Sequence, residues 1–317
     1  MHRQYRLLSS TLAIVLLCAA LAPAVLAGSD DLGGSFSIGD NAPNMDTPIS
    51  ASATSWDPTY QYSVTVPVED QDKMKDVSLV VLTMYRDGYA GAADPTSKVV
   101  MSWTRQGNSA NGALSIDGAG EGSYPWSLDS VDVPPGGETA GEWVLHFTVG
   151  DVAREGLWHV TASVTSGGQL TSSDPIDVTV NWYGRIKVNT PSVSWGQLAA
   201  SSSDNASGNI SVSYVANGDY RVAMNASGTW NGLDGNSATL ISSGAPTGTQ
   251  IALHGNVIGD RASAKQLGTA AVTVDETGVA TDQNGSTVDT NRLWLDLGDG
   301  FAKDTYNGTI TFVMGTR

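Results

Sequence analysis

The fold is decided by two runs of sequence between Trp143 and Gly168. They read Trp143-Val-Leu-His-Phe-Thr-Val149 and Gly156-Leu-Trp-His-Val-Thr-Ala-Ser-Val-Thr-Ser-Gly-Gly168. In each run, larger apolar side chains alternate with polar or smaller ones. A period of two places the apolar side chains on one face of a β-strand, whereas an amphipathic helix would need a period of 3.6. Both runs therefore predict strands with one buried face.

The same period recurs along most of the chain, and no long helical pattern interrupts it. Alternating or apolar runs occur at residues 60–68, 77–85, 176–182, 210–216, 220–224, 293–297 and 306–314. The run at 77–85 is apolar on both faces, which is typical of a central strand. Pro134-Pro-Gly-Gly137 marks a turn, and Asn217-Gly218 predicts a hairpin turn. These signals predict an all-β protein made of antiparallel β-sandwich domains, Ig-like or jelly-roll-like.

A length of 317 residues is enough for two such domains. We place the border near residues 183–188, and we expect one Ig-like sandwich at 50–184 and a second sandwich at 185–317. Residues 28–49 are rich in Gly, Asp, Asn and Pro, and they predict a flexible N-terminal arm in which only Phe36 to Ile38 forms a short strand.

Charge excludes one class of partner. The chain has 32 acidic and 16 basic residues, a net charge of −16 and a pI near 4.4. A nucleic-acid-binding protein needs a basic face, so nucleic acid is not an expected partner. Apolar residues make up 40% and charged residues 15%, which fits neither wholesale disorder nor a polytopic membrane protein.

Residues 1–27 have the layout of a secretory signal peptide. Arg3 and Arg6 precede an apolar stretch from Leu7 to Leu21, and Val25-Leu-Ala27 offers small residues before Gly28. The alternative is an uncleaved anchor helix, since the stretch is just long enough to span a bilayer. Cys18, the sole cysteine, leaves with a cleaved leader, so we expect a mature chain without disulfides or thiolate metal sites, located outside the cell and lacking a transmembrane anchor.

Several of these motifs resemble a known group of proteins. The run from Gly156 to Gly168 resembles the final hairpin of Ig-like domains in prokaryotic surface proteins, and Asp151-Val-Ala153 resembles the Asp-x-Ala corner of Ig folds. The acidic turn at 66–76 and the joining Asn181-Trp-Tyr-Gly184 look like secreted cell-envelope proteins of archaea. Stretches from Asn217 to Trp230 and from Leu293 to Phe312 resemble the second β-domain of those proteins. The resemblance implies a surface or S-layer-like role without catalysis.

Two groups of residues are candidates for metal binding. Glu69, Asp70 and Asp72, with Asp76 beyond, follow a strand and could hold Ca²⁺ through oxygen ligands, or they form a solvated acidic turn. His146 and His159 lie on the polar faces of their strands, where neighbouring strands could bring them together as two metal ligands; solvated strand histidines are the alternative. His254 is the only other histidine of the predicted domains, so no third ligand is placed, and we assign no metal residue.

Tryptophans and asparagines suggest contacts with glycans. Trp143, Trp158 and Trp182 are in register with apolar residues and are expected in the core. Trp56, Trp126 and Trp230 lie near turns, where they are either carbohydrate-binding platforms or packing residues, and packing is favoured. Five N-glycosylation sequons begin at Asn205, Asn209, Asn225, Asn284 and Asn307, all in the predicted second domain.

No nucleophile elbow, metalloprotease helix or other catalytic motif occurs in the chain. We therefore assign no catalytic residue and no cofactor. The sequence favours a non-enzymatic exported protein that acts by assembly or binding in the cell envelope, as a component of an S-layer, sheath or filament. Its expected partners are copies of itself or other envelope proteins, and glycans are a further candidate. The alternatives are a secreted carbohydrate-binding or adhesive protein and, third, a secreted hydrolase whose paired carboxylates meet only in three dimensions.

Overall fold

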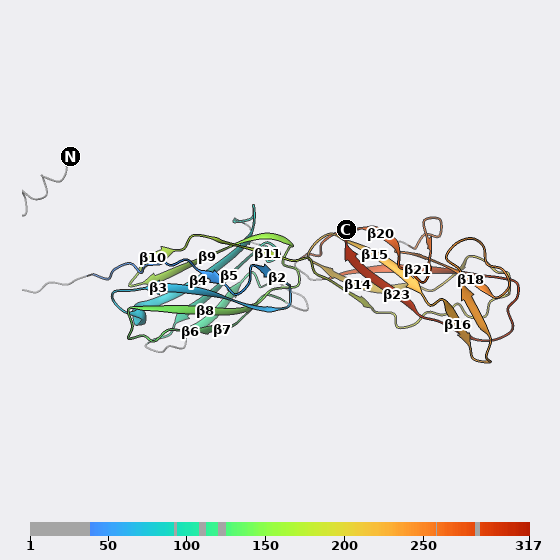
Figure 1. The fold of residues 1–317 in the computed structure, drawn as a ribbon, viewed down its shortest axis with the longest axis horizontal. Coiled ribbons are helices and arrows are strands. Elements are labelled where there is room, and N and C mark those ends of the chain that lie inside the picture. Colours follow the sequence, from blue (N-terminus) through green and yellow to red (C-terminus); the bar gives the residue numbers. More distant parts are fainter. Residues whose placement is uncertain (1–38, 92–93, 108–111, 120–124, 258, 283–285) are drawn as a thin grey trace, which may run out of the picture. The chain divides into compact units, whose positions relative to one another are not determined.

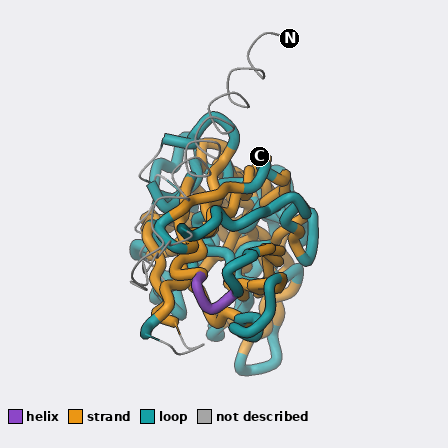
Figure 2. The backbone as a smooth tube through the Cα atoms, turned by 90° about the vertical axis from the view of Figure 1, so that its left-hand side faces the viewer, coloured by secondary structure: helices purple, strands orange, loops and turns teal. Residues whose placement is uncertain are grey.

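The computed structural model describes residues 39–317 except 92–93, 108–111, 120–124, 258 and 283–285 (Figure 1). Residues 40–317 form one compact unit. The predicted leader at 1–27 and the predicted strand from Phe36 to Ile38 lie outside the described residues. Strands dominate, and a short 3₁₀ turn at Met74–Asp76 (η2) is the segment coloured as helix in Figure 2. The prediction of an all-β fold made of antiparallel sheets is confirmed.

The first sandwich consists of two open sheets. One has four strands in the order β1 (Ser50–Ala51), β3 (Gln61–Glu69), β8 (Ala140–Thr148) and β7 (Ser127–Asp132). The other has the order β2 (Ser55–Trp56), β11 (Ile176–Val180), β9 (Gly156–Ser166), β4 (Val77–Arg86), β5 (Lys98–Arg105) and β6 (Gly112–Asp117), with β10 (Gln169–Ser172) paired to β9. All pairs are antiparallel except β2 with β11. Strand β4 is central, as predicted.

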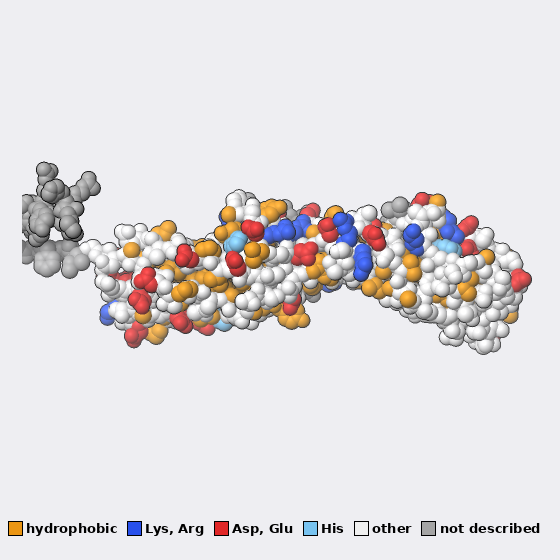
Figure 3. All heavy atoms as spheres, turned by 45° about the horizontal axis from the view of Figure 1, so that its top comes forward, with side chains coloured by type: hydrophobic (Ala, Val, Ile, Leu, Met, Phe, Trp, Pro, Cys, Tyr) orange, Lys and Arg blue, Asp and Glu red, His pale blue; other side chains and the backbone are white. Residues whose placement is uncertain are grey.

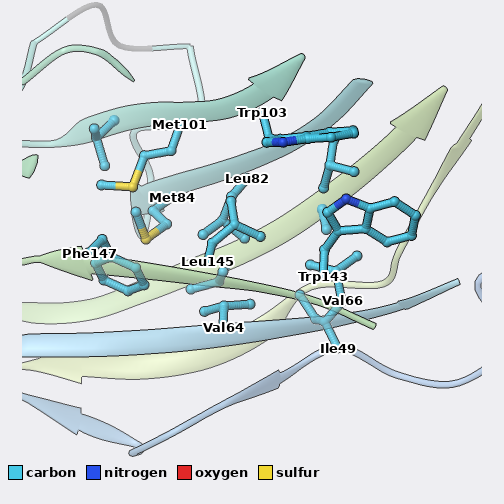
Figure 4. Close-up of a cluster of buried hydrophobic side chains, with 14 of the residues drawn as sticks. Ile49, Val64, Val66, Leu82, Met84, Met101, Trp103, Trp143, Leu145 and Phe147 are labelled. Atoms are coloured by element: carbon cyan, nitrogen blue, oxygen red, sulfur yellow. The ribbon is translucent and has the colours of Figure 1, made fainter. Parts of the chain in front are cut away.

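Side chains from both sheets meet in one apolar core. Trp143, Leu145 and Phe147 alternate along β8 and are fully buried, while Leu82 and Met84 enter the same core from β4 (Figure 4). Burying a side chain of this size stabilises the fold by about 1.5–3 kcal/mol. Strand β4 buries one face almost completely and the other only partly, so its apolar run reflects a central position and not two equally buried faces.

The described part of the predicted N-terminal arm packs on this sandwich. Met45 and Ile49 belong to the core, Asn44 forms an antiparallel bridge with Glu69, and the Pro43 carbonyl accepts a hydrogen bond from Thr171. Burial of these two apolar side chains, together with the hydrogen bonds to β3 and β10, holds the end of the arm against the sandwich.

The second set of sheets begins immediately downstream. The larger has nine strands: β12 (Gly184–Val188), β14 (Ile210–Ala216), β21 (Thr287–Leu297), β18 (Gln250–Asn256), β17 (Ser237–Leu240), β16 (Thr229–Gly232) and β22 (Tyr306–Asn307) in order, with β13 (Asn205–Ala206) on β21 and β19 (Lys265–Gln266) on β18. The smaller has β20 (Val272–Gly278), β15 (Tyr220–Ala226) and β23 (Ile310–Thr316). Strands β17 and β18 are parallel, and the other pairs are antiparallel. A second apolar cluster, separate from the first, includes Val212, Val222, Leu253 and Leu293.

Of two turns predicted from the sequence, the one at Gly167-Gly168 is present, and the hairpin turn at Asn217-Gly218 is not. Gly167 and Gly168 both have positive φ and close the β9–β10 hairpin, as the resemblance to Ig-like domains implied. Asn217-Gly218 was expected to close a hairpin, but neither residue has a positive φ, and β14 and β15 belong to different sheets. Asn217 is instead used in the contacts described below, which explains why this pair adopts another turn.

Candidate functional site

The acidic turn after β3 is held by hydrogen bonds from the protein itself. Asp70 is buried, and its carboxylate accepts from Ser166 Oγ at 2.5 Å and from the Asp72 backbone N–H at 2.9 Å. Asp72 accepts from the Asn41 backbone N–H at 2.7 Å, and Glu69 is exposed. Asp76 lies near the Arg105 guanidinium. Burial lowers the pKa of Arg105, and the charge of Asp76 offsets part of that decrease. These contacts account for the residues of the turn without the converging shell of oxygens that the calcium hypothesis requires.

The structure does not bring His146 and His159 together. His146 lies on β8 in the four-stranded sheet and His159 on β9 in the seven-stranded sheet, each on the face opposite its buried tryptophan. Outward faces of two packed sheets point away from each other. The idea of two metal ligands on neighbouring strands is therefore wrong, because strands consecutive in sequence joined different sheets.

Each of these histidines has a carboxylate partner instead. His146 Nε2 lies 3.0 Å from Asp132, and His159 Nδ1 lies 2.7 Å from Asp177 with Asp87 at 3.3 Å from Nε2. Burial tends to lower the pKa of His159, but the hydrogen bonds with Asp177 and Asp87 outweigh it and raise the pKa above its usual value. Both histidines thus form ion pairs on outward faces of the first sandwich; Figure 3 shows acidic, basic and histidine side chains together on one face of the molecule.

His254 has a different environment in the second sandwich. It lies on β18 with Nδ1 3.6 Å from Asp296, next to Arg261, which is paired with both Asp204 and Asp296. Burial and the charge of Arg261 lower the pKa of His254. Throughout the described ranges, no group of three or more His, Cys, Asp or Glu side chains is arranged to hold a metal ion.

The tryptophans are structural. Trp143 and Trp158 are fully buried, as expected, and the three that could have been carbohydrate platforms, Trp56, Trp126 and Trp230, are also buried. Trp126 packs against Trp158 with ring centroids 5.5 Å apart. Trp182 follows the end of β11 and is only partly buried, against the second cluster and not the first. Trp56, Trp126 and Trp230 are therefore packing residues, which is the interpretation that the sequence favoured.

The sequon asparagines differ in accessibility. Asn209 and Asn307 are exposed, whereas Asn225 is half-buried on the central strand β15. Asn205 is half-buried on β13, and its amide donates to the Leu295 carbonyl at 2.8 Å and to Ser202 Oγ at 3.0 Å. Asn284 lies outside the described residues. An oligosaccharide must reach the amide nitrogen, so Asn209 and Asn307 are the acceptors that the folded chain presents best.

One functional residue was missed by sequence reasoning: Asn217 joins the corner after β8 to the start of the second sandwich. Its side-chain amide donates to the carbonyls of Ala153 and Asn181, both at 2.8 Å, and its Oδ1 accepts from the Tyr183 backbone N–H at 2.7 Å. The side chain is fully buried; the bond to Ala153 is buried, and the bonds to Asn181 and Tyr183 are partly buried. An Asn-Gly pair in sequence signals a turn, which is why this contact was not foreseen.

Asp151 lies in the same region, in the corner that resembles Ig folds. Its side chain is fully buried; Oδ2 accepts from Arg185 Nη2 at 3.4 Å, and Oδ1 has no hydrogen-bond partner. Burial raises the pKa of Asp151 to about 6, although Arg185 favours the charged form. A group with this pKa changes charge in mildly acidic solution.

An open hollow of about 600 Å³ lies beside this junction. It is polar and carries both signs of charge, from Arg86, Arg154, Glu155, Asp219 and Arg317. Arg317 is paired with Asp219 at 3.5 Å, so the hollow has no strong excess of one sign.

Comparisons with known proteins add little. No protein-family model and no curated protein matches the chain. Among solved structures, the chain is similar to the C-terminal domain of the Streptococcus pyogenes antigen I/II-family protein AspA, with 8% sequence identity and a TM-score of 0.24, over 86% of this chain and 98% of that chain. A TM-score this low indicates neither a shared fold nor a shared function. Within the part of the chain that the structure describes, no helix has the length and apolar character that a membrane span requires.

Proposed function

We propose that this chain is an exported, non-enzymatic protein of the cell envelope that acts by assembly or binding, in the manner of archaeal S-layer, sheath or filament components. The observation that carries the proposal is the pair of exposed sequon asparagines, Asn209 and Asn307, on a chain that begins with an export-type leader. Acceptor asparagines are useful only on a chain that meets the glycosylation machinery during export.

The sheets also supply a means of assembly. Among the described residues, each of the four sheets is open, and its order ends at β1 and β7, β2 and β6, β12 and β22, or β20 and β23. Terminal strands present backbone N–H and C=O groups that can pair with another chain. The alternative of a carbohydrate-binding protein is weaker, because the tryptophans on which it depended are buried in the two cores.

Fractionation of source cells, combined with imaging of the cell surface, tests the proposal. We expect the protein in the envelope fraction, in a lattice or filament, with a mature mass that begins at or near Gly28. Peptide mapping should find glycan on Asn209 or Asn307 and none on Asn205. Recovery of the protein only in the cytoplasm, with residues 1–27 retained, would contradict export and the function built on it.

A glycan array and an activity screen separate the alternatives. A discrete sugar specificity without any lattice or envelope partner would favour the adhesive protein. Turnover of a polysaccharide, lost when one pair of facing carboxylates is changed to amides, would favour the hydrolase.

A further inference from the structure

A polar cluster lies on the inner face of the second sandwich, on strands β14 and β21. The two strands are antiparallel neighbours in which Tyr214 pairs with Thr287, Val212 with Asp289 and Ile210 with Asn291. Directly paired residues share a face of the sheet, and residues two apart share it as well. Tyr214, Asp289 and Asn291 therefore all project from the face on which Val212 and Ile210 are buried.

The facing sheet adds a second carboxylate. Asp275 on β20 pairs with Val222 of β15, which is fully buried, at an irregular point in the ladder. Tyr220 of β15 stacks on Tyr214, with ring centroids 5.6 Å apart. Asp275 and Asp289 thus come from opposing sheets, and burial, together with the charges of both, raises the pKa of Tyr214 and of Tyr220.

Two members of the cluster have unmet hydrogen-bonding capacity. Asn291 is fully buried, and no hydrogen bond of normal geometry from the described residues engages its amide nitrogen or its oxygen. Tyr214 is also fully buried, and its hydroxyl lacks a partner of normal geometry, although Asn291 lies near enough to oppose part of the rise in the pKa of Tyr214 that burial causes. Buried polar groups without partners are rare in folded proteins, and a bound ion or water is a common explanation.

The carboxylates are poorly compensated. Burial raises the pKa of Asp289, and the charge of Asp275 raises it further, with no cation among the contributing groups. One oxygen of Asp275, Oδ1, accepts from the backbone N–H and the hydroxyl of Thr277, and no hydrogen bond or ion pair within the described residues engages the other oxygen. Lys265 lines the same open hollow as Asp275 but forms no ion pair with it in the described structure. Two facing carboxylates without a cation repel each other.

We propose that this cluster binds one hard divalent cation, Ca²⁺, through the carboxylates of Asp275 and Asp289 and the Oδ1 of Asn291. The Tyr214 hydroxyl would donate a hydrogen bond to one of these oxygens. Ca²⁺ takes six to eight oxygen ligands in flexible geometry, so two carboxylates, one amide oxygen and water satisfy it. Asp275 and Asp289 are both partly exposed, which leaves a route for the ion.

The test compares thermal unfolding of the full exported chain in chelator and in Ca²⁺. Extracellular calcium modules bind with Kd values of about 0.1–1 mM. At about 10 mM Ca²⁺ the transition of the second sandwich should therefore rise by about 3–8 °C, while that of the first sandwich stays unchanged. Asp289→Asn, which is nearly isosteric, should abolish the rise and should be at least as stable as the wild type in chelator, because it removes the repulsion with Asp275.

Two further measurements keep the test decisive. Asp72→Asn, in the acidic turn of the first sandwich, is the matched control and should keep the full response to Ca²⁺. Tb³⁺ bound at this cluster should luminesce on excitation of the nearby tyrosines, Ca²⁺ should compete it away, and Asp289→Asn should remove the signal.

The proposal fails if Ca²⁺ gives no shift beyond that of Na⁺ at equal ionic strength, or if Asp289→Asn keeps the shift. Destabilisation of Asp289→Asn in chelator, together with no Tb³⁺ signal in the wild type, would assign the cluster to buried water and hydrogen bonding alone. None of these outcomes depends on where the protein is located, so they are separate from the test of the proposed function.

Discussion

The first sandwich buries five tryptophans to 1% exposure or less, whereas the second, which buries Trp230 less completely, builds most of its interior from aliphatic side chains, with two stacked tyrosines and the buried Asn291. In the first, aromatic contacts such as Trp103–Trp143 and Trp56–Phe147 link strands of both sheets at centroid distances of 5.9 and 5.2 Å. In the second, Tyr214 and Asn291 place several polar atoms inward without described partners of normal geometry, whereas the core of the first has the indole nitrogen of Trp143 in that state. The first sandwich therefore depends mainly on apolar burial, and the second depends also on what satisfies its polar interior.

Carboxylates show the same contrast. The conspicuous acidic turn of the first sandwich is already satisfied by Ser166 and by backbone N–H groups. The pair formed by Asp275 and Asp289 in the second is inconspicuous in sequence and uncompensated in the fold. The acidic turn therefore has protein donors for its carboxylates, whereas burial raises the pKa of Asp289 and the charge of Asp275 raises it further.

The largest effect that distinguishes the sandwiches should come from Trp158→Ala. Removing a fully buried indole leaves a cavity and should cost about 3–5 kcal/mol of unfolding free energy, confined to the first sandwich. Denaturant unfolding followed by tryptophan fluorescence and circular dichroism measures it. Leu157→Ala, on the exposed side of the same strand, is the control and should change stability by less than about 0.5 kcal/mol. An equal loss in both sandwiches would show that they unfold as one unit.

The next effect concerns Asp151 and depends on pH. Its folded pKa of about 6 lies above the ordinary value of 3.8, so the folded state holds a proton that the unfolded state releases first. Between pH 4 and pH 6 this group should reduce stability as the pH rises, by a total of about 3 kcal/mol, and its contribution should be constant above that window. Asp151→Asn should remove this component.

The readout for Asp151 is the melting temperature of wild type and variant across that range, since other carboxylates contribute equally to both. The wild type should lose stability relative to Asp151→Asn as the pH rises from 4 to 6. A constant difference between the two proteins would mean that Asp151 titrates normally.

A smaller effect should follow from Asn217→Ala, which tests how far the two sandwiches are independent. The change removes three buried or partly buried side-chain hydrogen bonds and should cost about 2 kcal/mol. Because the lost bonds connect the Ala153 corner with the start of the second sandwich, calorimetry should show the two transitions moving apart. Asn231→Ala, at an exposed position on β16, should leave the calorimetric profile unchanged. No separation of the transitions would show that Asn217 stabilises only its own turn.

The smallest effect is expected at His159 on the outer face of the first sandwich. Its raised pKa means that the ion pairs with Asp177 and Asp87 stabilise the fold fully below pH 6.5 and lose that contribution as the pH rises through the folded pKa. Asp177→Asn should bring the pKa of His159 down toward 6.5, measured by NMR titration of the ring. An unchanged pKa would assign the shift to Asp87 alone.

Local structure was predictable because it depends on side-chain period and turn residues. Alternation located β8, β9 and β14, and paired glycines at 167–168 located the β9–β10 hairpin. The predicted strands that included Tyr60 and Trp182 were one or two residues too long. Apolar residues beside a strand can continue the alternating pattern although they make none of the hydrogen bonds of the strand. The five sequon motifs are likewise visible in the sequence alone, and the leader at residues 1–27 stays a prediction.

Tertiary structure decided which residues meet. Period two assigns each side chain to a face of its own strand but says nothing about which strand lies beside it or opposite it. His146 and His159, close in sequence, therefore separated onto different sheets, while Asp275 and Asp289 came together from facing sheets. Asn217 looked like a turn residue and became the buried link at the junction, because the chain crossed there between sheets instead of turning back on itself.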